Sequence, residues 1–273
     1  MSNIFFGIGH GYGGTHLLAK LLNLPNDVDC QHERRDGYSR FSLFDKYRSV
    51  YAGLESDNVA YEERRHMISK TLNDGYRFGE INGILTFFAS ALHKHYPDAK
   101  FVYLTRNPMR QIVSMFNSGT YDEQIFLRIK KVPFWMLPKS VITKDAETNI
   151  CERLENEPTE QQWGKMTKLQ KCAWSWKLVN DEALRQLDSI PKEKVFIYKF
   201  EEMIRGARLE ELFKFLDLEL PSFEDVIKLV NIKHNKTPVR VKRPIPPWER
   251  LSKQKKNLIL TITWPTRRRL KYG

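Results

Sequence analysis

A glycine-rich turn near the N-terminus constrains this chain more than any other feature. Residues 9–14 read GHGYGG, with four glycines in six positions. They follow the apolar run Asn3 to Ile8, which is typical of a buried strand, and precede Thr15 to Leu24, where leucines recur at helical spacing. Glycine allows the backbone to curl tightly, so that several N–H groups converge at the positive N-terminal end of the helix. The segment therefore predicts a strand, an anion-binding loop and a helix, although a plain strand-to-helix turn would use the same residues.

Strands and helices alternate along the rest of the chain. Lys100 to Thr105 and Val195 to Lys199 are apolar runs that indicate further buried strands. Asn107 followed by Pro108 is typical of a helix start. Helical spacing predicts helices over residues 61–72, 85–95, 168–188 and 209–216. This alternation predicts an α/β fold in three layers, with a mostly parallel sheet flanked by helices.

Two long segments, residues 33–60 and 119–162, lack this regularity. They are polar, are interrupted by Gly and Pro, and contain scattered aromatic residues. Long irregular segments inside a compact domain often form lids or binding loops. The length of 273 residues suits one large domain or two small ones. We expect a single domain over residues 1–273, with the acceptor-binding or lid segments in these two places.

The identity of the phosphate compound depends on what surrounds the loop. Gly9, Gly11 and Gly14 match G-x-G-x-x-G, the pattern of an NAD(P)-dependent oxidoreductase. That fold also needs a second strand ending in an acid about 20 residues further on. Glu33 stands at that distance, but residues 26–35 are a poor strand sequence. A magnesium–triphosphate site is also disfavoured, because Thr15 stands where such a loop carries its lysine.

A second anion-binding position is predicted at the end of the strand Lys100 to Thr105. Arg106 follows this strand directly, and Ser114 lies two turns into the next helix. Ligands of open α/β sheets bind at the carboxyl ends of the strands. An arginine offers a planar fork suited to phosphate, and a serine hydroxyl adds a further hydrogen bond. The alternative is that Arg106 pairs with a structural carboxylate and that Ser114 only occupies a helix face.

The order and spacing of these segments resemble the sulfotransferase family, whose donor is 3′-phosphoadenosine-5′-phosphosulfate (PAPS). Strand, Gly-Gly-Thr loop and helix are followed by strand-Arg-x-Pro-x-x-x-x-x-Ser. Trp174 to Asn180 is similar to the family's aromatic helix, and Ile197 to Met203 is similar to its tyrosine-glutamate-aspartate-leucine segment. Phe213 to Leu218 is similar to the phenylalanine-leucine piece that follows. Lys233 to Trp248, with Lys271 to Gly273, is similar to its basic C-terminal stretch. The resemblance implies a P-loop nucleotide-binding-like fold and sulfuryl transfer without a metal.

The resemblance also implies which residues hold the donor. The loop would bind the 5′-phosphosulfate, and Arg106 and Ser114 would bind the 3′-phosphate of PAPS and of its product PAP. Tyr12 stands where family members usually carry Lys or Arg, so the cation that balances the leaving phosphate must come from elsewhere; the nearest candidates are His10, His16, Lys20, and Lys242 or Arg243. The expected donor-binding residues are therefore Gly11, Tyr12, Gly13, Gly14, Thr15, His16, Arg106, Ser114, Lys242 and Arg243.

The acceptor base is expected just after the first helix. In the family an acid or a histidine at this place lies near the acceptor hydroxyl, and His32 is the first candidate, with Glu33 second. Histidine suits the role because its ordinary pKa is near neutrality. A surface His-Glu pair without chemistry is the alternative. Glu80 and Asn82 line the acceptor pocket or only cap a turn.

Composition limits the partners. The net charge is +12, with basic residues gathered at 233–243 and 267–271, so an anionic partner is expected. A nucleic-acid-binding protein is the second rival to sulfuryl transfer, although a phosphorylated nucleotide satisfies the same charge and we expect no nucleic acid. Three distant cysteines show neither metal spacing nor a disulfide pattern. No secretory leader or apolar run of about 20 residues is seen. We therefore expect a cytoplasmic enzyme that sulfates a hydroxyl of a saccharide, lipid or small molecule.

Overall fold

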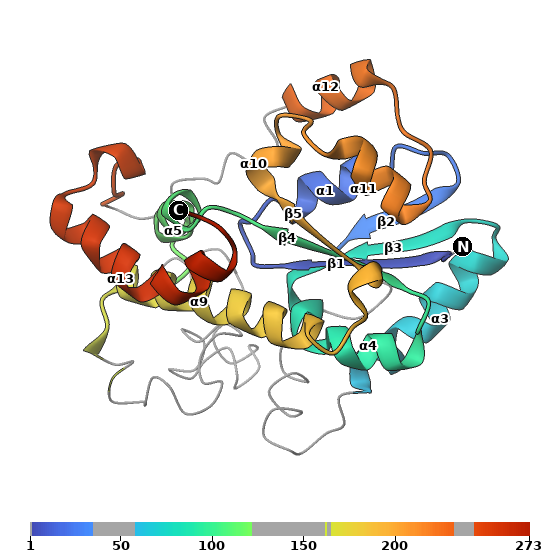
Figure 1. Cartoon of the computed structure of the whole chain (residues 1–273), viewed down its shortest axis with the longest axis horizontal. Coiled ribbons are helices and arrows are strands. Elements are labelled where there is room, and N and C mark those ends of the chain that lie inside the picture. Colours follow the sequence, from blue (N-terminus) through green and yellow to red (C-terminus); the bar gives the residue numbers. More distant parts are fainter. Residues whose placement is uncertain (1, 35–57, 122–161, 163–164, 232–242) are drawn as a thin grey trace, which may run out of the picture. The chain divides into compact units, whose positions relative to one another are not determined.

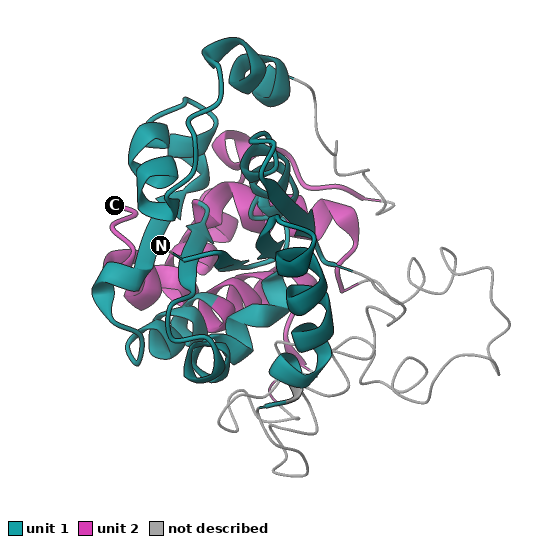
Figure 2. Ribbon diagram, turned by 90° about the vertical axis from the view of Figure 1, so that its right-hand side faces the viewer, with its two compact units in different colours: residues 1–106, 180–234 teal, residues 107–179, 235–273 magenta. Residues whose placement is uncertain are grey.

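The computed structural model describes residues 2–34, 58–121, 162, 165–231 and 243–273 (Figure 1). They divide into two compact units (Figure 2). The sheet unit comprises Met1–Arg106 and Asn180–His234, and the helical unit comprises Asn107–Val179 and Asn235–Gly273. The expectation of one domain over residues 1–273 stays a prediction. The irregular segments 33–60 and 119–162 lie almost entirely outside the described residues.

The sheet unit is built on five parallel strands in the order β2-β3-β1-β4-β5, which confirms the predicted α/β fold with a parallel sheet. The strand β1 is central, between β3 and β4, and most of its side chains are buried. Because all five strands run in the same direction, their carboxyl ends reach the same edge of the sheet. The strands are β1 (Ile4–Gly9), β2 (Val28–His32), β3 (Arg77–Ile81), β4 (Lys100–Thr105) and β5 (Val195–Lys199).

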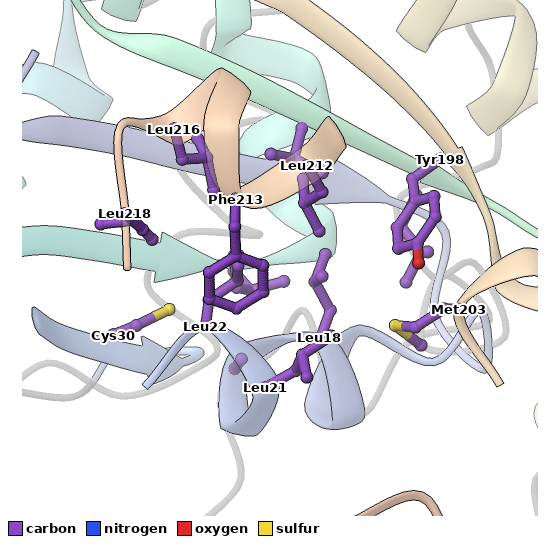
Figure 3. Close-up of a cluster of buried hydrophobic side chains, with 14 of the residues drawn as sticks. Leu18, Leu21, Leu22, Cys30, Tyr198, Met203, Leu212, Phe213, Leu216 and Leu218 are labelled. Carbon is purple, nitrogen blue, oxygen red and sulfur yellow. The ribbon is translucent and has the colours of Figure 1, made fainter. Parts of the chain in front are cut away.

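One face of the sheet is covered by α1 (Thr15–Leu22), α11 (Leu209–Leu216) and α12 (Phe223–Asn231). Leu18 and Leu22 of α1 face Leu212 and Phe213 of α11 in a cluster of buried side chains (Figure 3). Each residue of that cluster removes apolar surface from water, the main favourable term in folding. The helix α1, which follows the glycine loop, is therefore fixed by packing along its whole apolar side.

The opposite face carries aromatic side chains and a second set of helices. These are α3 (Val59–Asn73), the 3₁₀ helix η1 (Gly83–Phe88) and α4 (Ala89–His95). The ring of Phe6 lies 6.1 Å from that of Phe78 and 5.6 Å from that of Phe101. Side chains alternate between the two faces along each strand, so β1 can place Phe5 on one face and Phe6 on the other. The sheet unit thus has the three predicted layers.

Two strands correct the reading of the sequence. Residues 26–35 do contain a strand, β2, which pairs with β3 and not with β1. The strand β3 itself was not predicted, because Arg77 and Glu80 interrupt its apolar pattern. Glu80 is fully buried, and Arg64 of α3 holds it with two hydrogen bonds of 2.9 Å. A charged residue can occupy a buried strand when its partner is buried with it.

The helical unit contains α5 (Pro108–Ser118), the first part of α9 (Lys168–Leu187), a 3₁₀ turn at Trp248–Arg250 and α13 (Lys253–Arg269). Asn107 begins α5 as predicted, because its Oδ1 accepts a hydrogen bond of 2.9 Å from the backbone N–H of Met109. Trp176 Nε1 donates to Gln111 Oε1 at 3.1 Å and joins α9 to α5. The helix α13 was not predicted, because basic residues at both of its ends leave only a short apolar stretch between them, without a clear helical pattern. The remaining short elements are η5 (Lys192–Lys194) and α10 (Phe200–Met203), both in the sheet unit.

The buried pair of Arg64 and Glu80 makes a direct prediction about stability. Arg64→Met leaves the carboxylate of Glu80 in the core without its guanidinium, and we expect the free energy of unfolding to fall by about 3–5 kcal/mol. Urea unfolding followed by circular dichroism measures the loss.

The neighbouring Arg65 provides the matched control, because its ion pair with Glu62 is exposed. Arg65→Met should change the free energy of unfolding by less than about 0.5 kcal/mol. The double variant Arg64→Met/Glu80→Gln should regain part of the stability, because Glu80 is then no longer a buried charge without its guanidinium; the loss of the ion pair between Arg64 and Glu63, 2.8 Å long, is common to both variants. Equal effects of the two arginine variants would show that burial does not decide the contribution of this pair.

Candidate functional site

The glycine loop leaves β1 at a point where only glycine fits. A Cβ atom on Gly9 would lie 2.4 Å from the carbonyl oxygen of Leu104 in β4, and the φ angle of Gly9 is 153°. Thr86 Oγ1 accepts a hydrogen bond of 3.0 Å from Gly9 N and donates one of 3.1 Å to Gly9 O. Gly14, with a φ angle of 99°, is the residue before α1. Both ends of the loop are therefore fixed in conformations that favour glycine.

His10 lies inside the loop and is buried. Its Nδ1 donates a hydrogen bond of 2.7 Å to the carbonyl oxygen of Gly11. Burial, partly opposed by this hydrogen bond, lowers the pKa of His10 to about 4. The ring is therefore neutral at physiological pH, and His10 is not the missing cation.

His32 and Thr15 are brought together by the sheet, although 17 residues separate them in the sequence. His32 is the last residue of β2, and its Nε2 lies 2.9 Å from the Oγ1 of Thr15, the first residue of α1. The His16 ring stands edge-to-face to that of His32, with centroids 5.3 Å apart. Glu33 has a φ angle of 50°, and its N–H donates to Ile81 O at 3.1 Å. Both predicted base candidates thus lie at the carboxyl edge of the sheet, with His32 on the loop's threonine.

Arg106 also contacts the loop. Its Nη1 donates a hydrogen bond of 2.8 Å to the carbonyl oxygen of Tyr12. The guanidinium carbon lies 4.5 Å from the centroid of the Phe200 ring, and Phe200 is the first residue of α10 directly after β5. The sequence predicted an anion-binding arginine at the end of β4. The sequence carried no signal for the contact between Arg106 and Phe200. This contact arises because β4 and β5, which the two residues follow, are neighbours in the sheet.

The other predicted donor-binding residues are placed less completely. Ser114 lies on α5 and is half-buried, and Arg243 is exposed; both belong to the helical unit. Lys242 lies outside the described residues. Lys20 is exposed in the last turn of α1, about 7 Å along the axis from the start of that helix. The roles of Ser114, Lys242 and Arg243 in donor binding stay predictions.

Glu80 and Asn82 serve the structure. The Asn82 Oδ1 accepts a hydrogen bond of 3.0 Å from Ile84 N and begins η1, so Asn82 caps a turn as the second alternative had it, whereas Glu80 lies within β3. The Asn82 Nδ2 donates to Glu80 Oε1 at 2.9 Å. Asn82 N also donates to Gly7 O at 2.8 Å, so the chain turns from β3 directly beside the central strand. This turn brings Gly83 close to the glycine loop, because a Cβ on Gly83 would lie 3.0 Å from Gly9 O.

Three further findings concern metals, thiols and membranes. Among the described residues, no group of three or more His, Cys, Asp or Glu side chains could hold a metal ion. Cys30 and Cys172 are buried and free, and burial raises the pKa of the Cys30 thiol; Cys151 lies outside the described residues. In the part of the chain that the structure describes, no helix has the length and apolar character needed to cross a membrane.

The buried histidine predicts how stability depends on pH. The folded pKa of His10 is about 4, below its ordinary value of 6.5, so the unfolded chain binds the extra proton first. The stability that neutral His10 contributes is complete above pH 6.5 and is lost as the pH falls toward 4. The total loss from this residue is about 3 kcal/mol.

His10→Asn tests this dependence, because Asn keeps a donor for Gly11 O but does not titrate. The difference in unfolding free energy between wild type and variant should shrink by that amount between pH 7 and pH 4, measured by urea unfolding. His66→Asn, at an exposed position of α3, is the matched control for removal of a histidine. A constant difference across this range would mean that His10 is not kept neutral by burial.

Comparison with known proteins places the chain in a family. The family model of a sulfotransferase domain matches residues 46–226, more than half of the chain. A search of curated protein sequences found no match to this chain. The match includes Arg106 and Ser114 and begins after the glycine loop.

Solved structures show the same fold. A sulfotransferase domain from the curacin biosynthetic pathway matches with a TM-score of 0.54 at 11% identity, over 100% of this chain and 99% of that one. A sulfotransferase from Alicyclobacillus acidocaldarius matches with a TM-score of 0.51 at 18% identity, over 100% and 95% of the two chains. One from Mycobacterium avium matches with a TM-score of 0.51 at 14% identity, over 98% and 76%.

The sheet order agrees with this assignment. In a dinucleotide-binding fold the second strand lies beside the first, whereas here β3 separates β2 from β1. The literal G-x-G-x-x-G match therefore lacks the sheet that an NAD(P)-dependent oxidoreductase needs. With its family model, its sheet and its loop, the chain belongs to the sulfotransferase family and is a sulfotransferase enzyme.

Proposed function

We propose that the chain transfers the sulfuryl group of PAPS to an acceptor hydroxyl. The observation that carries the proposal is the meeting of a glycine loop, Arg106 and the Thr15–His32 pair at the carboxyl edge of one parallel sheet. Backbone N–H groups and a helix N-terminus favour a phosphate in the loop. A guanidinium beside them favours a donor that carries more than one anionic group. Both features agree with a nucleotide that has a 5′-phosphosulfate and a 3′-phosphate.

On the donor side, the loop from Gly11 to His16 would hold the 5′-phosphosulfate. The 3′-phosphate would bind Arg106 and Ser114, with Lys242 and Arg243 adding positive charge from the C-terminal stretch. No Lys or Arg occurs in residues 9–16, so the backbone N–H groups of the loop would stabilise the leaving phosphate together with a cation from elsewhere in the chain. Transfer of a sulfuryl group, which bears less charge than a phosphoryl group, then needs no metal.

On the acceptor side, His32 would take the proton of the attacking hydroxyl, with Glu33 as its orienting partner or substitute. The acceptor oxygen forms a bond to sulfur while the bond from sulfur to the 5′-phosphate oxygen breaks. The products are a sulfate ester, PAP and a protonated base. Thr15 would link the two sides, because Nε2 of His32 faces its Oγ1: the proton would arrive on Nδ1, and in that tautomer Nε2 already carries the hydrogen that it donates to Thr15. Its Oγ1 then accepts from His32 Nε2 and directs its own hydrogen toward the anion in the loop.

The donor assignment predicts which nucleotide stabilises the fold. Adenosine 3′,5′-bisphosphate at about 100 times its dissociation constant should raise the free energy of unfolding by about 2.7 kcal/mol. ATP with magnesium should raise it less, because Thr15 stands in place of the lysine of a triphosphate loop. Thermal unfolding with each nucleotide and with NADH measures the shifts. Equal or greater stabilisation by magnesium–ATP or NADH would contradict the donor assignment.

The base assignment predicts a loss of turnover without loss of donor affinity. His32→Ala should reduce turnover about 10²–10⁴-fold, the usual contribution of a positioned base, with bisphosphate affinity changed little. Sulfate transfer from labelled PAPS to phenols, sugars and lipid alcohols provides the assay. Glu33→Gln should cost less if Glu33 orients the ring, and more if Glu33 takes the proton.

The contact with Thr15 requires a second histidine variant. His32→Gln keeps an amide that can hydrogen bond to Thr15 Oγ1 but cannot accept a proton at this pH. If His32 is the base, His32→Gln is as inactive as His32→Ala. If His32 only holds Thr15, the glutamine restores turnover, and the base assignment is wrong.

A further inference from the structure

We propose that α13 binds the surface of a membrane that contains anionic lipids, with Trp264 and Arg268 as contact residues. This helix spans Lys253–Arg269 in the helical unit and is drawn in red in Figure 1. Binding of this kind attaches a protein to one face of a bilayer without crossing it. It depends on neither the donor nor the acceptor of the proposed reaction.

The sequence around α13 is basic throughout. Residues 251–273 include seven Lys or Arg and no Asp or Glu. Three of the basic residues lie in the first turn of the helix, where positive charge opposes the helix dipole, so helix stability does not account for them. A cluster of about four to eight basic residues on an amphipathic helix is typical of binding to anionic lipids. The seven are Lys253, Lys255, Lys256, Arg267, Arg268, Arg269 and Lys271.

Trp264 places an aromatic ring among these charges. Its side chain is 50% exposed, and among the described residues of the helical unit it is the only large hydrophobic residue that is exposed. The guanidinium carbons of Arg267 and Arg268 lie 5.1 and 5.6 Å from the centroid of its ring. Tryptophan favours the boundary between lipid headgroups and acyl chains, and arginine binds the phosphates of the headgroups. The two kinds of side chain therefore occur here in the combination that a lipid surface favours.

The two arginines beside Trp264 have no acidic partner. Within the part of the chain that the structure describes, neither Arg267 nor Arg268 forms an ion pair with a carboxylate. Arg267 is only 6% exposed, and its buried Nε has no hydrogen-bond partner. A guanidinium keeps its charge when it is buried, and burial without a counter-charge is costly. A lipid phosphate beside the indole would supply that counter-charge.

The exposed residues of α13 form one stripe along the helix. They recur at intervals of three or four residues, which keeps them on one side. The 17 residues of the helix extend over about 26 Å. A straight stripe of this length with one exposed aromatic residue suits a flat surface, whereas single-stranded nucleic acid is usually bound in a groove with several aromatic rings on which bases stack. The stripe consists of Lys253, Asn257, Thr261, Trp264 and Arg268, and the opposite side is buried through Ile259, Thr263 and Thr266.

Co-sedimentation with lipid vesicles tests this surface. Wild type should bind vesicles of phosphatidylcholine and phosphatidylserine in equal parts, should not bind vesicles of phosphatidylcholine alone, and should be released by salt. Arg268→Gln should weaken binding about fivefold, and Trp264→Ala about 5–10-fold. Both side chains are exposed, so urea unfolding of the variants should match that of wild type.

Arg65→Gln is the matched control, because it removes an exposed positive charge from α3. It should change vesicle binding less than about twofold, since charges distant from the lipid surface are screened. Equal losses in Arg65→Gln and Arg268→Gln would mean that net charge alone attracts the protein, and absence of binding to the anionic vesicles would also overturn the inference.

Lipids brominated in the acyl chain test whether the indole enters the bilayer boundary, because bromine quenches tryptophan fluorescence only at short range. The chain contains six Trp, so the quenching of Trp264→Phe is subtracted from that of wild type. Quenching that is lost in Trp264→Phe supports the inference, and equal quenching in both proteins contradicts it. Duplex oligonucleotides and heparin are compared at the same ionic strength. If either binds more tightly than the vesicles and Arg268→Gln weakens that binding, the surface recognises a nucleic acid or an anionic polysaccharide and the lipid assignment is wrong.

Discussion

The close approach of Gly9 to the backbone of β4 is the constraint on which the site depends. A side chain at this position would collide with Leu104 O, so the end of β1 can lie against its neighbour only because residue 9 is glycine. Thr86 of η1 forms hydrogen bonds with both the N–H and the carbonyl oxygen of Gly9. The direction in which the loop leaves the sheet is thereby fixed. The parallel order then brings His32, Arg106 and Phe200, which end or follow other strands, to the same edge.

The electrostatics of this edge explain why an arginine is suited to the position. Desolvation lowers the pKa of a buried histidine, as it does for His10, and would also shift a lysine toward its neutral form. A guanidinium keeps its charge under the same conditions, and its flat surface can stack on an aromatic ring while its edge donates hydrogen bonds. Arg106 does both, toward Phe200 and Tyr12. The anion site that we propose therefore does not require a lysine in the loop.

Much of this architecture was predictable, because the deciding patterns are local. Apolar runs predicted β4 and β5, and helical spacing predicted α11, with the bounds that the structure has. The strand β3 was missed because Glu80 is neutralised by Arg64, a partner that no local pattern reveals. The glycine loop, His32 and Arg106 were selected from sequence, but the contacts of Arg106 with Tyr12 and Phe200 span 94 residues in each direction. Contacts of that kind depend on strand order, and β2 at the sheet edge was not expected.

The position of β2 has a chemical consequence for the proposed reaction. Because β3 lies between β1 and β2, a residue at the end of β2 is displaced from the loop and reaches it through the first turn of α1. His32 does so at Thr15, the residue whose N–H begins the helix and whose hydroxyl faces the imidazole. One hydrogen bond thus separates the proposed base from the donor site. In the proposed reaction Nδ1 of His32 would take the acceptor's proton, because Nε2 faces Thr15 and carries the hydrogen that it donates to Oγ1. The hydroxyl of Thr15 would then keep its own hydrogen for the anion in the loop, so one pair of side chains would serve both the acceptor and the donor.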